Sequence, residues 1–218
     1  MSLKLTLSHI TKHYEGKTVL SDCSCSFDGS GVYALMGPNG SGKSTLLRVC
    51  ALLEQPDAGK VSYIAGGDIV QQDVDLKRRI VLVLPRVGVF NTTVFKNAAY
   101  GLKIRDVESR EIQKRVDRVL DVVGLIHKKQ QNALTLSSGE TQRLGIARAM
   151  VTDPEILFLD EPTASIDEEN TGIVEGIILS LKREARTTII ITTHDRDQAS
   201  RIADRVLMMH DGGIVLQK

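Results

Sequence analysis

The stretch of sequence that decides the fold is the glycine-rich run Gly37-Pro38-Asn39-Gly40-Ser41-Gly42-Lys43-Ser44-Thr45. It matches a phosphate-binding loop, and it lies between an apolar run at residues 32–36 and a helical pattern at residues 44–53, as that motif requires. Small residues let backbone N–H groups close around phosphates at the positive end of a helix. The run predicts a nucleotide site in which Lys43 reaches the β- and γ-phosphates and Ser44 ligates Mg²⁺. The full match argues against a plain glycine-rich turn with a solvated lysine.

A second apolar run, at residues 156–159, ends in two acids, Asp160 and Glu161. Alone, such a run is more often a strand that meets a polar loop. Beside a phosphate loop it supplies what the chemistry still needs, which is a carboxylate for the metal and a group that orients water. We expect Asp160 to bind Mg²⁺ through water and Glu161 to act as the general base toward the attacking water.

The segments around these two motifs predict an α/β fold. Strand-like runs open the chain, and a mostly helical middle follows, with helical spacing over residues 106–123 and Gly124 as a stop. Strands are expected at residues 3–10, 18–27, 31–36, 60–64, 80–84, 156–159 and 187–192, and in a hairpin at 206–216. Later helices are expected at residues 138–151, 167–183 and 195–203. Apolar strands flanked by helices indicate a parallel sheet covered on both faces.

The composition agrees with one globular α/β domain. The chain has 218 residues, of which 42% are hydrophobic and 25% charged, which excludes disordered and collagen-like classes. Its 28 basic and 27 acidic side chains leave a net charge of +1, so we expect no nucleic-acid partner. The three cysteines, Cys23, Cys25 and Cys50, cannot all pair, and small core residues in a reducing compartment are favoured over metal or redox roles.

No apolar run approaches the roughly 18 to 20 residues that span a bilayer. The first residues, 1–7, alternate apolar and polar side chains like a strand and lack the apolar core of a signal peptide. We therefore expect the protein to stay in the cytosol.

Further motifs, in order along the chain, give a resemblance to the ATP-binding cassette (ABC) ATPases over essentially the whole length. Leu136-Ser137-Ser138-Gly139-Glu140 resembles the family signature LSGGQ, and Ser165-Ile166-Asp167 resembles the D-loop. His194 resembles the switch histidine, and Tyr14 lies where the family stacks an aromatic ring on adenine. Each motif is weak alone, but their joint order and spacing make coincidence improbable.

The resemblance implies an α/β fold with a P-loop NTPase core of the ABC ATPase type, an antiparallel β subdomain and a helical subdomain. It implies one ABC ATPase domain over residues 1–218, with the helical subdomain inserted at about residues 86–150. It assigns catalysis to Glu161, His194 and Lys43, and Mg²⁺ binding to Ser44 and Asp160. The ATP-binding residues that it implies are Tyr14, Gly37, Pro38, Asn39, Gly40, Ser41, Gly42, Lys43, Ser44, Thr45, Ser137, Gly139 and Asp167.

The family's signature lies too far from its own phosphate loop to touch that nucleotide, so the resemblance implies a head-to-tail pair of chains around two ATP molecules. In that pair Ser137 and the Gly139 N–H would meet the γ-phosphate held by the partner's loop. His194 would stabilise charge in the transition state, and Asp167 would couple the two sites.

This chain departs from the family pattern in two places. Ser138 and Glu140 replace Gly and Gln in the signature, and the added charge of Glu140 weakens closure if it points inward. Pro85 aligns with a glutamine that ordinarily ligates Mg²⁺, and proline has no side-chain oxygen. Either the metal keeps an extra water, or Arg86 takes over part of the sensing, or the alignment is off by one residue.

By resemblance, the function is that of an ATP-hydrolysing subunit at the cytoplasmic face of the cell membrane. Its expected partners are a second copy of itself or a homologous ATPase subunit, transmembrane permease subunits and a substrate-binding protein. Residues 86–100 would dock the permease, with Val87, Val89 and Phe90 either exposed for this or part of the core. Residues 94–102 resemble importer ATPases, with an oxyanion such as tungstate or molybdate as cargo. The alternative is a soluble ABC ATPase that acts as a regulator or mechanical switch; a module that binds ATP without hydrolysis is disfavoured by the four groups present: Lys43, Asp160, Glu161 and His194.

Overall fold

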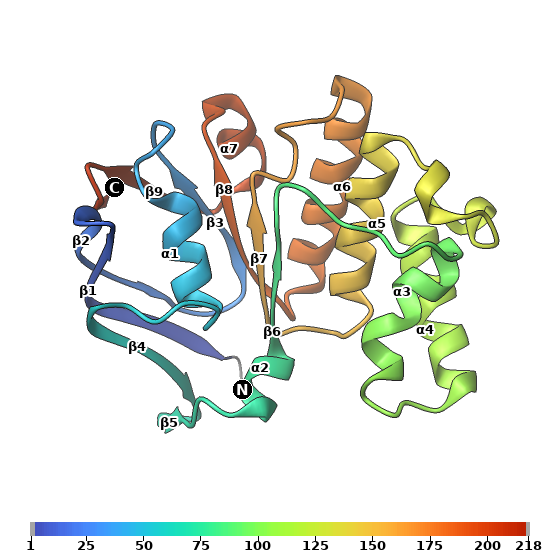
Figure 1. Ribbon diagram of the computed structural model, residues 1–218, viewed down its shortest axis with the longest axis horizontal. Coiled ribbons are helices and arrows are strands. Elements are labelled where there is room, and N and C mark those ends of the chain that lie inside the picture. The colour runs from blue at the N-terminus through green and yellow to red at the C-terminus, as the bar shows by residue number, and fades with distance from the viewer. Residues whose placement is uncertain (1–2, 217–218) are drawn as a thin grey trace. The chain divides into compact units, whose positions relative to one another are not determined.

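The computed structural model describes residues 3–216 (Figure 1). The first two and the last two residues lie outside this range. The strand-like alternation expected for residues 1–7 therefore begins outside the described residues. The chain divides into two compact units. The first contains the residues up to 82, 155–161 and those from 181 onward, and the second contains residues 83–154 and 162–180.

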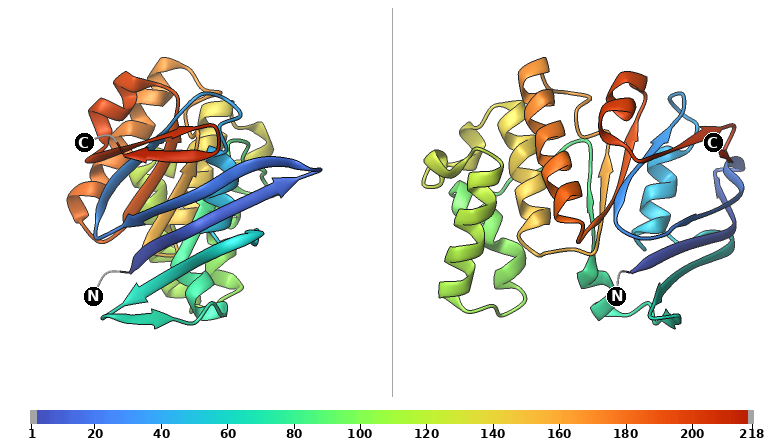
Figure 2. Two further views of the ribbon diagram at one scale, coloured as in Figure 1. Left: turned by 90° about the vertical axis from the view of Figure 1, so that its left-hand side faces the viewer. Right: turned by 180° about the vertical axis from the view of Figure 1, so that it is seen from behind.

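An antiparallel sheet forms one layer of the first unit, as the resemblance implied (Figure 2, left, blue to teal). Its strand order is β2-β1-β4-β5, and its members are β1 (Lys4–Tyr14), β2 (Lys17–Phe27), β4 (Ala58–Ala65) and β5 (Asp68–Val70). The first strand is longer than predicted, because the pairing of β1 with β2 continues past register shifts to Tyr14. His9 and Asp22 lie at these shifts with φ of 53° and 52°, the local backbone distortion that a bulge requires.

The second sheet contains parallel strands, and the candidate site lies at their carboxyl ends. Its strand order is β10-β9-β3-β8-β7-β6. Its members are β3 (Gly31–Met36), β6 (Ile80–Val83), β7 (Ile156–Asp160), β8 (Thr188–Thr193), β9 (Arg205–His210) and β10 (Gly213–Leu216). β3 and β7 both pair in parallel with β8, so the three strands end at the same edge, and ligands of open α/β sheets bind at such an edge.

Helix α1 (Lys43–Cys50) packs into the core of the first unit, which includes side chains of both sheets. Its Leu46 and Leu47 belong to one apolar cluster with Leu5 of β1 and Phe158 of β7. The phosphate loop before α1 is therefore held on a helix that is anchored by buried apolar area. The remaining helices of this unit are α2 (Val74–Arg79) and α7 (Arg196–Ile202); α2 and β5 are too short to show a periodicity in the sequence.

The cysteines are core residues, as predicted. All three are free thiols, with Cys23 and Cys50 buried and Cys25 half-buried. Burial raises the pKa of Cys25 to about 12. A thiol that stays protonated at neutral pH is a poor nucleophile and a poor metal ligand.

The second unit is mainly helical. It contains α3 (Val94–Lys103), α4 (Ser109–Val122), the 3₁₀ turns η1 (Ile126–Lys128) and η2 (Ala133–Thr135), α5 (Ser138–Met150) and most of α6 (Glu168–Glu184). α3 and α4 pack against each other and against α5. Helical spacing predicted α4, α5 and α6 within a few residues, whereas α3 was not predicted as a helix.

The loop before α3 is fixed by Asn97, whose side chain is fully buried. Its Oδ1 accepts a hydrogen bond from Phe90 N at 2.8 Å, and its Nδ2 donates to the carbonyl oxygens of Phe90 and Thr93 at 3.1 and 3.0 Å. Within the same unit Val87 packs against Gly145 of α5, where no Cβ would fit. Of the three apolar residues that the sequence left open, Val87 is thus part of the packing and Phe90 is exposed.

Among residues 3–216 no helix has both the length and the apolar character needed to cross a bilayer.

Candidate active site

Residues 37–42 join β3 to α1, and they have the backbone geometry of a phosphate cradle. Gly37 and Gly42 have φ of 154° and 99°. A Cβ at Gly37 would collide with the carbonyl oxygen of Met209, and a Cβ at Gly42 would collide with that of Val19. Glycine is therefore required at both positions, because the conformation is left-handed and the neighbouring backbone is too close.

Two buried polar groups in the loop fit a phosphate ligand. Ser41 Oγ is buried without a hydrogen-bond partner among the described residues, which is unusual for a native hydroxyl and is explained by a ligand that bonds to it. Lys43 has a side chain that is 4% exposed. Its Nζ donates to the carbonyl oxygens of Gly37 and Pro38 at 2.9 and 3.2 Å, which keeps a positive charge at the centre of the loop.

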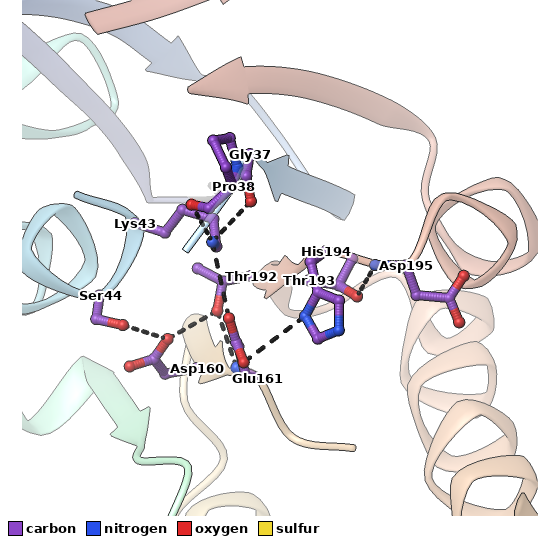
Figure 3. Close-up of polar contacts among 10 residues, drawn as sticks. All are labelled: Gly37, Pro38, Lys43, Ser44, Asp160, Glu161, Thr192, Thr193, His194 and Asp195. Atoms are coloured by element: carbon purple, nitrogen blue, oxygen red, sulfur yellow. Dashed lines mark hydrogen bonds and ion pairs between the residues drawn. The ribbon is translucent and has the colours of Figure 1, made fainter. Parts of the chain in front are cut away.

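Asp160, at the end of β7, accepts hydrogen bonds from two hydroxyl groups (Figure 3). Ser44 Oγ donates to Asp160 Oδ1 at 3.0 Å, and Thr192 Oγ1 donates to the same oxygen at 2.7 Å. The parallel pairing of β7 with β8 places Asp160 opposite Thr192. Asp160 is 1% exposed, so these hydrogen bonds also offset part of the cost of burying its carboxylate.

Glu161 lies between two basic side chains. Its Oε1 is 3.7 Å from Lys43 Nζ, and its Oε2 is 3.8 Å from His194 Nδ1. The residue has a φ of 42°, an uncommon value for a non-glycine residue, and its N–H donates to Thr192 Oγ1 at 2.8 Å. The predicted catalytic residues Lys43, Glu161 and His194 are thus brought together by β3, β7 and β8.

The donor set fits Mg²⁺. Ser44 and Asp160 supply a hydroxyl and a carboxylate oxygen side by side, and Mg²⁺ takes one or two carboxylates together with substrate phosphates and waters. In the part of the chain that the structure describes there is no group of three or more His, Cys, Asp or Glu side chains suited to a metal. The hydroxyl of Ser44 and the carboxylate of Asp160 suit a metal that also binds the phosphates of a substrate.

Tyr14, at the end of β1, lies beside the phosphate loop. Its hydroxyl donates to the carboxylate of Glu54 and is also hydrogen-bonded to the Thr45 side chain. Arg48 forms an ion pair with the same Glu54 at 3.4 Å. Burial, and then the Glu54 carboxylate, raise the pKa of Tyr14. The residue remains 39% exposed, so its ring is accessible to a planar ligand.

In the second unit, the predicted signature begins α5. Ser137 is the N-cap: its Oγ accepts from Glu140 N at 3.2 Å, while Glu140 Oε2 accepts from Ser137 N at 3.0 Å. Lys128 Nζ lies 2.5 Å from Glu140 Oε1. This ion pair, and then the bond from Ser137 N, hold the pKa of Glu140 below its usual range. The negative charge that Glu140 adds to the signature is therefore neutralised within the same unit.

Gly139 and Asp167 meet through Asn170. The Asn170 side chain lies against Gly139 so closely that a Cβ there would collide with it. Its backbone N and its Nδ2 both donate to Asp167 Oδ1 at 2.8 Å, and these bonds lower the pKa of Asp167. The structure thus brings the predicted signature and D-loop residues together in one cluster.

Sequence reasoning did not single out Thr192, Lys128 or Asn170. For Thr192 a signal was available, because it lies two residues before the candidate site residue His194 and follows three consecutive isoleucines. Lys128 carries no local signal, since its partner Glu140 lies 12 residues away. Asn170 has a local partner in Asp167, but its contact with Gly139 joins residues that are far apart in the chain.

Comparison with known proteins gives three findings. A family model described as ABC transporter matches residues 20–164. The ATP-binding protein TupC of the tungstate uptake system of Peptoclostridium acidaminophilum is 37% identical over 97% of both chains, and the phosphate import ATP-binding protein PstB 2 of Natronomonas pharaonis is 36% identical over 97% of this chain and 78% of its own. The structure of cbiO1 from Clostridium perfringens, part of the ABC transporter complex cbiONQ, matches 100% of this chain and 88% of its own with a TM-score of 0.87 and 28% identity.

Proposed function

The chain belongs to the ABC transporter family of ATP-binding proteins, and we propose that it works as a head-to-tail pair that hydrolyses Mg·ATP to drive the import of an oxyanion. As a member of this family it is the ATPase subunit of a membrane transporter, as the sequence predicted. The observation that carries the residue assignments is the meeting of Lys43, Ser44, Asp160 and Glu161 at one edge of the sheet.

In the proposed mechanism, the backbone N–H groups of the loop and the Lys43 ammonium bind the phosphates of ATP. Ser44 and Asp160 would hold Mg²⁺, which supplies electrostatic stabilisation of the charge on the phosphoryl oxygens. Glu161 accepts the proton of the attacking water, and His194 donates a hydrogen bond to the phosphoryl group. Tyr14 stacks on adenine.

The second half of each site comes from the partner chain in this proposal. Ser137 and the Gly139 N–H begin α5, and the N-terminus of a helix attracts the negative charge of a phosphate. Asp167, held by Asn170, couples this end to the neighbouring site. Pairing is reciprocal in a two-fold assembly, so two ATP molecules are bound per pair.

We further propose that the helical subdomain of about residues 86–150 docks a transmembrane permease on the cytoplasmic face of the membrane. Phe90 and Tyr100 are 42% and 47% exposed and lie with ring centroids 4.7 Å apart. Arg148 covers Phe90 at 5.0 Å from the ring centroid. Exposed aromatic side chains with a neighbouring arginine are typical of interface centres. Pro85 precedes this patch and has no side-chain oxygen to offer a metal.

The proposed cargo is an oxyanion of the tungstate or molybdate type, delivered by a substrate-binding protein. Its support is that TupC belongs to a tungstate uptake system and PstB 2 is a phosphate import protein. The test reconstitutes this chain with its permease in proteoliposomes. The ATPase rate of the complex is expected to rise when the binding protein is loaded with tungstate. Stimulation by an unrelated cargo alone would contradict this assignment.

ATP hydrolysis by the purified chain tests the residue assignments. Glu161→Gln is expected to lower the steady-state rate about 10²- to 10⁴-fold, the usual contribution of a general base, while ATP still binds. Glu108→Gln, the same change at an exposed residue before α4, is the matched control and is expected to hydrolyse ATP normally. Hydrolysis by the Glu161 variant at the wild-type rate would overturn the assignment.

Affinity purification from detergent-solubilised membranes of the host, followed by mass spectrometry, tests the membrane assembly. Recovery of a multi-span membrane protein supports the proposed transporter complex. Recovery only from the soluble fraction, with ribosomal, DNA-repair or no partners, favours the alternative of a soluble ABC regulator.

A further inference from the structure

We propose that Thr192 is a positioning residue for ATP hydrolysis, because one hydroxyl group fixes both the metal-binding Asp160 and the general base Glu161. This inference rests on the proposed function of the same site. Thr192 does not itself contact the reacting atoms in this proposal; it acts through the two acids.

The geometry that carries the inference is a bridge between two strands (Figure 3). Thr192 lies in β8, opposite Asp160 of β7 in the parallel register. Its Oγ1 donates to Asp160 Oδ1 at 2.7 Å and accepts from Glu161 N at 2.8 Å. Thr192 is fully buried, so its hydroxyl is shielded from bulk water, which strengthens the bonds that it makes.

The bridge uses the hydroxyl as both donor and acceptor. A hydroxyl has one proton and two lone pairs, so the proton can go to Asp160 while a lone pair accepts the Glu161 N–H. Ser44 donates to the same oxygen of Asp160, and this pair of donors sets the orientation of the carboxylate. Asp160 Oδ2, which accepts from neither hydroxyl, then points in a defined direction for the metal and its waters.

The acceptor half of the bridge acts on the backbone of Glu161. That residue has a φ of 42°, and such a conformation costs energy unless the surroundings hold it. The bond from Glu161 N to Thr192 supplies one of these restraints, and it keeps the carboxylate between Lys43 and His194. Valine has the same shape as threonine but neither donates nor accepts, so it would release both acids at once.

The strand offers a matched control. Thr188 begins β8, is 1% exposed and also donates a hydrogen bond from its hydroxyl, to Gly29 O at 2.9 Å. It lies at the opposite end of the strand from the acids. Thr188→Val therefore reproduces the loss of a hydrogen bond from a buried threonine hydroxyl, with its cost in stability, without touching Asp160 or Glu161.

The test compares Thr192→Val, Thr192→Ser and Thr188→Val in the full chain. For Thr192→Val we expect kcat to fall about 10- to 100-fold and the Mg²⁺ concentration for half-maximal rate to rise about 10-fold, the range for partners that orient a metal ligand. Mn²⁺ affinity in the presence of ADP, measured by electron paramagnetic resonance, should weaken about 10-fold. Binding of ATP without metal should stay within about twofold, because the phosphate loop is unchanged. Thr192→Ser should restore most of the lost kcat and most of the lost metal affinity.

The inference is overturned if Thr192→Val keeps wild-type kcat and Mn²⁺ affinity, if Thr188→Val shows the same losses, or if Thr192→Ser fails to restore them. A wild-type chain that binds Mn²⁺ with ADP but hydrolyses no ATP refutes the proposed function, while the Mn²⁺ affinities still decide the role of Thr192. A wild-type chain that binds no Mn²⁺ with ADP refutes both.

Discussion

At the scale of single residues, Tyr14 combines a fixed hydroxyl with an accessible ring. The hydroxyl is bonded to Glu54 and Thr45, and Lys12 Nζ lies 5.6 Å from the ring centroid. Because these contacts orient the side chain before a ligand arrives, little rotamer entropy remains to be lost on binding. The ring supplies the stacking energy, and the hydroxyl supplies only the orientation.

Tyr14→Ala is therefore expected to weaken ATP binding more than Tyr14→Phe. Stacking of a base on an aromatic ring contributes about 1 to 3 kcal/mol, so the alanine variant should raise the KM for ATP at least fivefold with kcat little changed. The phenylalanine variant keeps the ring and should stay within about threefold of wild type. Steady-state kinetics over a range of ATP concentrations measure both values, and equal effects of the two variants would show that stacking is not the source of the affinity.

At the scale of elements, the start of α5 shows how a departure from the family signature is accommodated. Glu140 closes a capping box with Ser137 and forms an ion pair with Lys128 of η1. The capping box satisfies backbone donors at the helix start. The ion pair neutralises the negative charge of Glu140 within its own unit. We therefore expect the N-terminus of α5 to keep the positive partial charge that attracts a phosphate.

The ion pair predicts a pH dependence of stability. The pKa of Glu140 is lower in the folded chain than its ordinary value, so its contribution is complete above about pH 4.3, the pKa of an unperturbed glutamate, and is lost as the pH falls through the folded value. Lys128→Met should be less stable than wild type at pH 7 by about 1 kcal/mol or less. Urea unfolding measured from pH 7 to pH 3 should show this difference shrink below about pH 4.

The control for this prediction is Lys103→Met, which removes the same charge from an exposed position in the last turn of α3. Its difference from wild type should change less over the same pH range. A difference between wild type and the Lys128 variant that stays constant down to pH 3 would show that the ion pair does not contribute to stability.

At the scale of the whole molecule, the residues proposed for one ATP site are divided between the two units. Lys43, Asp160 and Glu161 belong to the first unit, and Ser137 and Gly139 belong to the second. In the head-to-tail pair that we propose, each site takes its loop from one chain and its signature from the other. Lesions in the two halves should therefore complement each other when two variants are mixed.

Mixing Lys43→Ala with Ser137→Asp tests this arrangement. Aspartate is also a good N-cap, so α5 should still begin normally, while its charge repels the phosphate. Each variant alone is expected to be inactive. A mixed pair has one site with both lesions and one site with neither, so an equal mixture should recover about a quarter of the wild-type ATPase rate if pairing is random.

The control for the mixture is Lys43→Ala with Glu161→Gln, since both lesions fall in the same half of the site. No intact site forms in that mixed pair, and no activity should return. Absence of recovery with the Ser137 variant, when both variants are folded and bind to the wild-type chain, would contradict the head-to-tail pairing.

The sequence by itself determined the fold class, the family and the residue types of the nucleotide site. This was possible because the phosphate loop depends on local conformation: glycines that permit the left-handed backbone, a strand before them and a helix after them. The strands and the longer helices could also be predicted, because burial on one or both faces imposes a short period on the sequence. Helix α3 was missed, since its buried Asn97 and its Gly101 weaken the apolar pattern.

Only the tertiary structure decided which side chains fix these groups. Thr192 meets Asp160 because β8 lies beside β7 in a particular register, and Lys128 meets Glu140 because η1 packs near the start of α5. Such contacts join residues that are distant in the chain, and no local propensity encodes strand order or helix packing. The residues of the proposed site could therefore be named from short motifs, whereas the orientation of their side chains came from the packing around them.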